Sequence, residues 1–298
     1  MHQTVVVATD LSEAADEAVR QAHERAQAPG ARLIVVHVIP NLMPSDPLFP
    51  QLEQEMVLAL PALQERITEQ VSQRIETLTG RKADEFEVVV EAGIPHAVIV
   101  QRAEQRHADL VVVGSHGSSG VTRILLGSVA DKVVRHAHCP VLVARHTPKS
   151  GKILVATDFS DPSLPAVAAA GEEARRAGAR ATILNSIDLG PALAESASMA
   201  FGAPSYGFSP EVRKDLRDAV DGMLANALSR YGIEGDRFVA HGPAAPAILR
   251  YADQLQAELI VVGTIGRTGL PRLLLGSVAE VVVRSARCSV LVVRLSAG

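Results

Sequence analysis

The chain contains the same domain-sized sequence twice. Residues 109–145 and 258–294 align without a gap at an offset of 149, and 22 of the 37 aligned positions are identical. The openings also match, because Val-Ala-Thr-Asp-Leu-Ser at 7–12 corresponds to Val-Ala-Thr-Asp-Phe-Ser at 155–160. The offset is half of the 298-residue length. We therefore predict two similar domains, 1–147 and 151–298, separated by a short linker that contains Pro and Gly.

Short apolar runs alternate with helical patterns in each half, which is typical of parallel βαβ units. Apolar runs such as Leu-Val-Val-Val at 110–113 suit a sheet that is covered on both faces. Right-handed crossovers then predict two doubly wound, Rossmann-like α/β domains. In the first half, strands are predicted near 4–9, 32–39, 86–91, 109–114 and 140–145, with helices at 12–27, 61–79, 95–107 and 128–137. In the second half, strands are predicted near 151–157, 180–187, 236–241, 258–263 and 288–294, with helices at 162–177, 210–231, 244–256 and 277–286.

Two segments, 40–60 and 188–210, follow the second predicted strand of each half and are rich in Pro, Gly, Ser or Met. We predict that both are long loops. Loops of this length are usually functional or disordered, so lids over a site and solvated connectors are both open.

Charge and composition exclude several classes of protein. Twenty-nine basic against thirty-three acidic residues give a net charge of −4, which argues against nucleic acid as a partner. Apolar runs of at most five residues argue against a membrane span. A strand-like Val-Val-Val-Ala at 5–8 leaves no room for a signal peptide, and two cysteines suit a reducing compartment. We expect a soluble, cytoplasmic protein.

Each half has a glycine cluster directly after its fourth predicted strand. The pattern Gly-x2-Gly-x9-Gly-Ser occupies 114–128 and 263–277, and a helix is predicted to begin at each serine. Such a loop lets backbone N–H groups approach an anion, and a helix N-terminus adds partial positive charge. The pattern predicts a polyphosphate site without a dedicated lysine. Arg123 and Arg272 either add a phosphate contact or lie in solvent.

Two familiar nucleotide motifs do not fit these glycines. The P-loop requires a Lys directly before the Ser, and here that position is Gly127 or Gly276. The dinucleotide fingerprint belongs in the first strand–helix turn, whereas these glycines follow the fourth strand.

The glycine pattern, the Ala-Thr-Asp-x-Ser opening, the Gly-Ser-Val-Ala helix start and the closing Cys-Pro-Val-Leu-Val at 139–143 resemble the universal stress protein family. The resemblance covers essentially the whole chain as two tandem domains. It implies a five-stranded parallel sheet of order 3-2-1-4-5 in each half. It also implies binding of ATP, with Mg²⁺, in the branch that keeps the glycine motif.

The implied order makes strands 1 and 4 neighbours at a switch point, where ligands of such sheets bind. By resemblance, Ala8, Thr9 and Asp10 meet the adenosine, and the backbone of Val38 reads the adenine edge. Ribose and phosphates fall to Gly114, His116, Gly117, Gly127, Ser128 and Val129. The matching positions of the second half are Ala156, Thr157, Asp158, Ser186, Gly263, Ile265, Gly266, Gly276, Ser277 and Val278.

Several of these residues also have purely structural interpretations. Ser128 and Ser277 begin capping-box patterns, and Asp10 and Asp158 suit the N-cap of the first helix of each half. Cys139 and Cys288, which precede the last strands, are interpreted as buried structural thiols. The His-x-His-Cys run at 136–139 is not repeated in the second half, so no metal site is predicted.

Three functional hypotheses remain open. The first is an ATP-binding, stress-responsive or signalling module whose ligand shifts its conformation or partner choice. The second is a slow ATPase or autophosphorylating protein, although no convergent catalytic group is evident beyond the glycine loops, so no catalytic residue is assigned. The third is a nucleotide-free interaction scaffold.

The last strands, at 141–143 and 290–293, are apolar and predicted to lie at sheet edges, which favour pairing. We predict that they join the two halves as a pseudo-dimer, or two chains as a homodimer. Replacing Val143 or Val292 by Lys should weaken that assembly, as measured by sedimentation and thermal unfolding. Unchanged assembly and stability would contradict the prediction.

Overall fold

A computed structural model describes residues 3–40, 50–116, 126–188, 210–264 and 275–294. The chain divides into two compact units, Met1–His146 and Thr147–Gly298. Each unit is a doubly wound α/β domain, as predicted.

The first unit contains a five-stranded sheet in the order β3-β2-β1-β4-β5, and all neighbouring strands are parallel. This is the predicted order 3-2-1-4-5. Its elements are β1 (Thr4–Ala8), α1 (Glu13–Arg25), β2 (Arg32–Pro40), α2 (Pro50–Thr79), the 3₁₀ turn η1 (Ala83–Glu85), β3 (Glu87–Gly93), α3 (Pro95–Gln105), β4 (Leu110–Gly114), α4 (Ser128–His136) and β5 (Val141–Ala144).

The second unit repeats this arrangement in the order β8-β7-β6-β9-β10, again with parallel neighbours. Its described elements are β6 (Lys152–Ala156), α5 (Leu164–Ala177), β7 (Arg180–Ile187), α7 (Pro210–Arg230), β8 (Gly235–His241), α8 (Ala244–Leu255), β9 (Leu259–Gly263), α9 (Ser277–Ser285) and β10 (Ser289–Val293).

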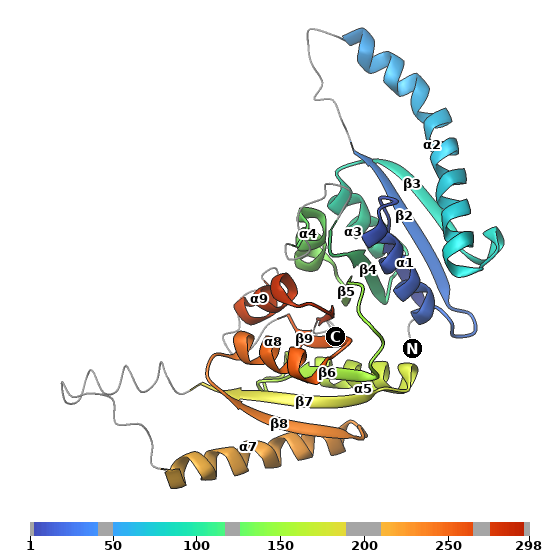
Figure 1. The fold of residues 1–298 in the computed structure, drawn as a ribbon. Coiled ribbons are helices and arrows are strands. Elements are labelled where there is room, and N and C mark those ends of the chain that lie inside the picture. The colour runs from blue at the N-terminus through green and yellow to red at the C-terminus, as the bar shows by residue number, and fades with distance from the viewer. Residues whose placement is uncertain (1–2, 41–49, 117–125, 189–209, 265–274, 295–298) are drawn as a thin grey trace. The chain divides into compact units, whose positions relative to one another are not determined.

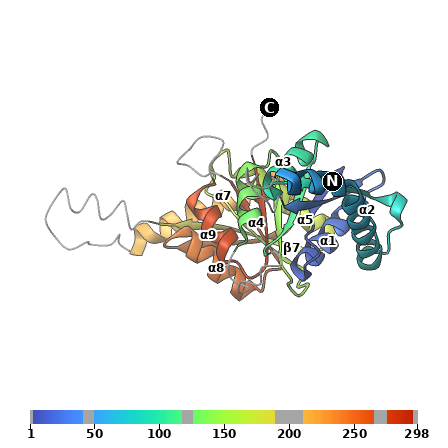
Figure 2. The same ribbon diagram turned by 90° about the horizontal axis from the view of Figure 1, so that it is seen from above.

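Helices cover both faces of each sheet (Figure 1). Helices α1 and α2 contact one another, as do α3 and α4; in the second unit α8 contacts α9, and these two lie side by side in Figure 2. The strand order explains this layering, because right-handed crossovers that move in opposite directions along a sheet place their helices on opposite faces. Central strands such as Val5–Val7 and Leu110–Val112 are therefore fully buried.

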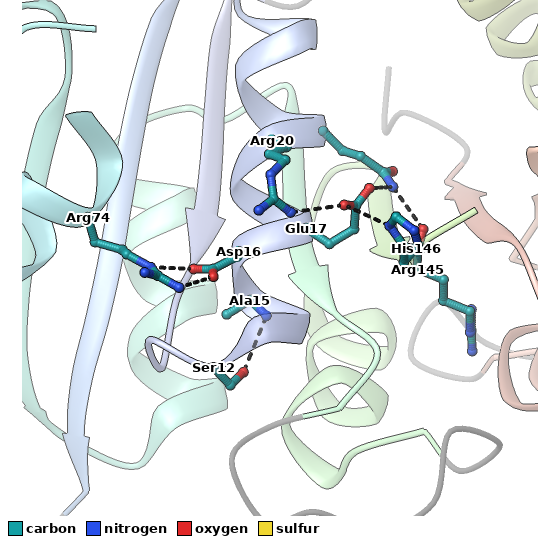
Figure 3. Close-up of polar contacts among 9 residues, drawn as sticks. Ser12, Ala15, Asp16, Glu17, Arg20, Arg74, Arg145 and His146 are labelled. Atoms are coloured by element: carbon teal, nitrogen blue, oxygen red, sulfur yellow. Dashed lines mark hydrogen bonds and ion pairs between the residues drawn. The ribbon is translucent and has the colours of Figure 1, made fainter. Parts of the chain in front are cut away.

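Helix α1 is fixed directly after the end of β1. Ser12 is its N-cap, and the Ser12 hydroxyl accepts a hydrogen bond from the Ala15 N–H at 3.3 Å. The buried Asp16 receives the guanidinium of Arg74 from α2 through two hydrogen bonds, one of them at 3.0 Å from Nε (Figure 3). This ion pair ties α1 to α2 on one face of the sheet.

Glu17, the next residue of α1, forms a more exposed cluster (Figure 3). Its carboxylate accepts hydrogen bonds from Arg20 at 3.3 Å and from Gln21 at 2.8 Å, and it lies 3.6 Å from Nδ1 of His146. Gln21 also donates to the carbonyl of Arg145 at 3.1 Å. The chain that follows β5 is thus held against α1.

The prediction of a loop at 40–60 is wrong for residues 50–60, which are helical. Helix α2 begins at Pro50 and continues through Pro61, whereas the prediction started the helix at 61. Residues 51–60 are mostly Leu, Glu, Gln, Met and Ala, which favour helices, and Pro50 suits the first helical position. Nine of these ten residues favour a helix, and together they outweigh one interior proline. Residues 41–49, and 189–209 of the other predicted loop, lie outside the described residues.

No described helix is both long enough and apolar enough to cross a membrane.

The two ion pairs on α1 provide a matched stability test. Arg74 and Arg20 are similarly exposed, at 45% and 47%, but their partners differ, because Asp16 is 3% exposed and Glu17 is 16% exposed. Arg74→Met leaves a buried carboxylate without its cation, so it should lower the free energy of unfolding several-fold more than Arg20→Met. Urea denaturation measures both. Equal losses would contradict the structural importance of the Asp16–Arg74 pair.

Candidate functional site

Both units have a cavity where two neighbouring strands end together. Strands β1 and β4 are adjacent and end at Ala8 and Gly114, while β6 and β9 end at Ala156 and Gly263. The crossovers leave these strand pairs in opposite directions, which opens a crevice at their carboxyl ends.

The first cavity has a volume of about 280 Å³. All predicted site residues of the first half that the structure describes line it: Ala8, Thr9, Asp10, Val38, Gly114, His116, Gly127, Ser128 and Val129. Gly117 and Arg123 lie outside the described residues.

The second cavity has a volume of about 460 Å³. The described predicted residues of the second half line it in the same way: Ala156, Thr157, Asp158, Ser186, Gly263, Gly276, Ser277 and Val278. Ile265, Gly266 and Arg272 lie outside the described residues.

A helix begins at the edge of each cavity. The N-cap of α4 is Gly127 and that of α9 is Gly276, each with extended backbone and without a side-chain cap. The alternative that Ser128 and Ser277 are N-caps is therefore wrong, because both serines are the first residues inside their helices. The first N–H groups of a helix have no intrahelical acceptor, so those of both helices are available to a ligand in the cavity.

The glycine N-caps are held by a bond to the neighbouring strand end. The Gly127 N–H donates to the Ser115 carbonyl at 2.8 Å, and the Gly276 N–H donates to the Thr264 carbonyl at 2.7 Å. Ser115 and Thr264 directly follow β4 and β9. This bond fixes the helix start against the strand end in both units.

Asp10 and Asp158 each sit in a tight turn at the cavity. Oδ1 of Asp10 accepts from the Ser12 N–H at 3.0 Å, and Oδ1 of Asp158 accepts from the Ser160 N–H at 3.0 Å. The alternative that these aspartates cap the first helices is wrong, because Ser12 and Ser163 are the N-caps of α1 and α5.

The residue after each aspartate has a left-handed backbone. Leu11 has a φ of 63° and Phe159 a φ of 61°, which is unfavourable for bulky side chains. Their N–H groups donate to the hydroxyls of Thr9 and Thr157 at 3.1 and 3.0 Å. Strained backbone of this kind persists where surrounding contacts fix it, as these threonines do.

A side chain from the second strand of each unit holds the same turn. Nδ1 of His37 donates to the Thr9 carbonyl at 2.9 Å, and Nδ2 of Asn185 donates to the Thr157 carbonyl at 2.8 Å. Sequence reasoning missed both residues, although each directly precedes a predicted site residue. The available signal was that both side chains at this repeated position carry an N–H donor.

The backbone of Val38 and Ser186 is directed toward the cavities. The last backbone hydrogen bond between the first two strands of the first unit runs from the Thr9 N–H to the Val36 carbonyl at 2.9 Å. In the second unit it runs from the Thr157 N–H to the Leu184 carbonyl at 3.0 Å. Backbone direction alternates along a strand, so residues two positions later point to the same side. Beside Val38 and Ser186, β1 and β6 have already ended, so these backbone groups have no strand partner on that side.

Gly114 has a structural reason to be glycine. A Cβ atom there would lie 2.8 Å from the carbonyl oxygen of Ala14 at the start of α1. Glycine thus permits the close approach of β4 and α1.

Among the described residues that line the two cavities, only His116 has a buried side-chain nitrogen or oxygen without a hydrogen-bond partner. Its Nδ1 lies 2.7 Å from the Ser115 hydroxyl, whereas its Nε2 is buried without a protein partner. A buried nitrogen of this kind is costly unless a ligand or water meets it.

Cys139 and Cys288 are buried at 6% and 4% exposure, consistent with structural thiols. Among the described residues, no group of three His, Cys, Asp or Glu side chains has a metal-binding arrangement.

The His37 contact predicts a pH dependence of stability. Burial lowers the pKa of His37 below its ordinary 6.5, outweighing the opposing effects of the Thr9 hydrogen bond and the Asp10 charge. Because the folded-state pKa is depressed, this contribution to stability is complete above pH 6.5 and is lost as pH falls toward the folded-state pKa. His37→Asn, which introduces the residue of the second half, should flatten that decrease in urea denaturation between about pH 7 and 5. An unchanged slope, or an NMR titration midpoint of His37 at or above 6.5, would contradict the prediction.

Comparison with known proteins agrees with this geometry. The model of the universal stress protein family matches residues 1–145 and 149–294. A universal stress protein of Mycobacterium tuberculosis is 30% identical over 315 residues, which cover 98% of this chain and 95% of the relative. A second one from that species is 31% identical over 307 residues, covering 98% and 96%.

Solved structures show the same fold across both units. A universal stress protein from Archaeoglobus fulgidus superposes with a TM-score of 0.63 at 24% identity, covering 98% of each chain. One described as a putative universal stress protein from Pseudomonas aeruginosa gives 0.64 at 20% identity, covering 99% of this chain and 94% of the other. Two family domains in one chain, each with the same switch-point cavity, make this protein a tandem member of the universal stress protein family.

Proposed function

We propose that each unit binds an adenine nucleotide, ATP with Mg²⁺, in its switch-point cavity, and that the protein acts as a nucleotide-dependent stress-response module. The observation that carries this proposal is the convergence of two independent elements on one cavity. The strand end at 8–10 and the helix start at 127–129 are more than 100 residues apart in sequence and line the same space. The second unit repeats this convergence.

The helix starts suit the phosphates. The first N–H groups of α4 and α9 supply donors and partial positive charge at the cavity edge. Each hydrogen bond to a charged acceptor contributes about 1.5–3 kcal/mol, so a few amides suffice without a lysine. In the first unit, the buried Nε2 of His116 adds a further polar group that a ribose or phosphate oxygen would satisfy.

The strand ends suit the nucleoside. The N–H and carbonyl of Val38 point past the end of β1, and a backbone donor beside an acceptor complements N1 and the N6 amine of adenine. Val36, Pro40, Pro95 and Ile99 give this end of the first cavity an apolar lining for the base. Asp10, which follows the end of β1, also lines this cavity and would provide a carboxylate for the ribose or Mg²⁺.

Substitution of the N-cap glycines tests the proposal in both units. Gly127→Val and Gly276→Val place a branched side chain among the helix-start amides, so each should remove one nucleotide. Gly222→Val is the control, because a Cβ there meets no atom within 4 Å. Native mass spectrometry with Mg-ATP should count two nucleotides on the unmodified chain and on the control, and one on each variant.

A chain that binds no nucleotide would overturn this proposal and favour a scaffold. Phosphate release above the buffer rate, abolished by both substitutions together, would instead support the ATPase hypothesis. Release at the buffer rate would eliminate it.

A further inference from the structure

Two histidines from neighbouring helices of the first unit lie close together. His96 is in the first turn of α3 and His136 is the last residue of α4, and their ring centroids are 6.1 Å apart with the ring planes tilted by 44°. Helices α3 and α4 contact one another (Figure 1). The sequence run at 136–139 did not indicate a metal site, because the partner of His136 comes from a different helix.

The separation of the two rings suits a shared metal ion. A metal–nitrogen bond of about 2.0–2.1 Å places the ion roughly 3.2 Å from each ring centroid. Two rings on one ion then have centroids about 5.2 Å apart in tetrahedral geometry and about 6.4 Å apart in linear geometry. The observed separation of 6.1 Å lies within this range, so small side-chain rotations bring both rings onto one ion.

The hydrogen bond of His136 leaves one particular nitrogen for coordination. Its Nδ1 donates to the Lys132 carbonyl oxygen at 2.7 Å, so in the neutral ring Nε2 carries the lone pair. Metal-ligating histidines almost always donate their other ring N–H to a carbonyl or carboxylate, which fixes the tautomer and the ring orientation. His136 has this second bond already.

His96 is kept neutral, as a metal ligand must be. Burial lowers the pKa of His96 below its ordinary 6.5, and the positive charges of Lys132 and of protonated His136 lower it further. No described residue forms a hydrogen bond with His96. Lys132 would also repel a cation, but its side chain is exposed, so solvent and salt screen that repulsion.

We propose that His96 and His136 together bind a divalent transition-metal ion, with water completing its coordination. Imidazole nitrogen suits Zn²⁺, Ni²⁺ and Cu²⁺, whereas Mg²⁺ and Ca²⁺ prefer oxygen ligands. Among the described residues, no third His, Cys, Asp or Glu joins the pair, so the site has two protein ligands and open positions. The second unit has Ala245 and Ser285 at the corresponding positions, which confines the site to the first unit.

Calorimetric titration of Zn²⁺ or Ni²⁺ into the untagged, nucleotide-free chain tests this site. One ion should bind per chain. His96→Ala and His136→Ala should each lower the affinity by more than roughly 10-fold, because even the loss of an outer-shell partner of a metal ligand costs about 10- to 100-fold. His138→Ala, which removes an exposed histidine of the same run, is the matched control and should leave the affinity unchanged.

A substitution at Lys132 should act in the opposite direction. Lys132→Val, which introduces the residue found at position 281 of the second unit, removes the nearby positive charge and should strengthen binding. A folding defect would weaken binding instead, so this variant separates the electrostatic effect from a loss of structure. Cu²⁺ bound to the unmodified chain should show nitrogen hyperfine coupling from two imidazoles in electron paramagnetic resonance.

The inference is overturned if the unmodified chain binds none of these ions. It is equally overturned if His96→Ala, His136→Ala and His138→Ala bind Zn²⁺ with the same affinity. Because these titrations contain no nucleotide, their outcomes do not bear on the proposed function of the two cavities.

Discussion

The last backbone hydrogen bond between the first two strands of each unit determines the geometry of its cavity. The Thr9 N–H bonds to the Val36 carbonyl, and β1 ends there while β2 continues to Pro40. Strand β4, on the other side of β1, ends at Gly114. When a central strand ends before its neighbour, backbone groups on that side of the neighbour have no strand partner at the carboxyl-terminal end of the sheet. The cavity and the directed backbone of Val38 both follow from this early ending.

The turn after that bond is a constraint that two different side chains satisfy. His37 and Asn185 each donate to the carbonyl of the threonine that directly follows the strand, although their sizes and titration behaviour differ. The threonine hydroxyls then hold Leu11 and Phe159 in the left-handed conformation. The two units thus have the same turn, and a histidine holds it in the first unit where an asparagine holds it in the second. The requirement is therefore for an N–H donor at this position, not for a particular side chain.

Nearly all element boundaries were predictable, because apolar strands buried on both faces give a strong and unambiguous pattern. The strand order was instead implied by the resemblance to the family. The errors occurred where one residue type serves two purposes. Pro61 was read as a helix start, but favourable neighbours carry the helix through it. Ser128 suited a cap by its type, yet the glycine before it is the N-cap, because the Gly127 carbonyl accepts the first intrahelical hydrogen bond, from the Asp131 N–H at 3.0 Å.

The residues that line the candidate site could be predicted, but the contacts that hold them in place could not. The resemblance to the family implied which residues gather at the switch point, and those that the structure describes line the two cavities. It did not indicate that Gly114 is needed for the approach of α1, or that His37 and Asn185 hold the turn. The approach of α1 to β4 depends on a distance between segments that are far apart in sequence, which no local pattern encodes. The role of His37 and Asn185 was indicated only by the N–H donor that both side chains carry at the repeated position.

Comparison of the two units shows which parts of the cavity are alike and which parts differ. The helix starts of the two units are alike, because each begins after a glycine N-cap with extended backbone and relies on main-chain N–H groups, which every residue except proline provides. The strand ends differ, because Val38 and Pro40 of the first cavity correspond to Ser186 and Asp188 of the second. A replacement of proline at a strand end alters both a side chain and a backbone donor, and it leaves the helix-start amides unchanged. The two ends of each cavity can therefore vary independently of one another.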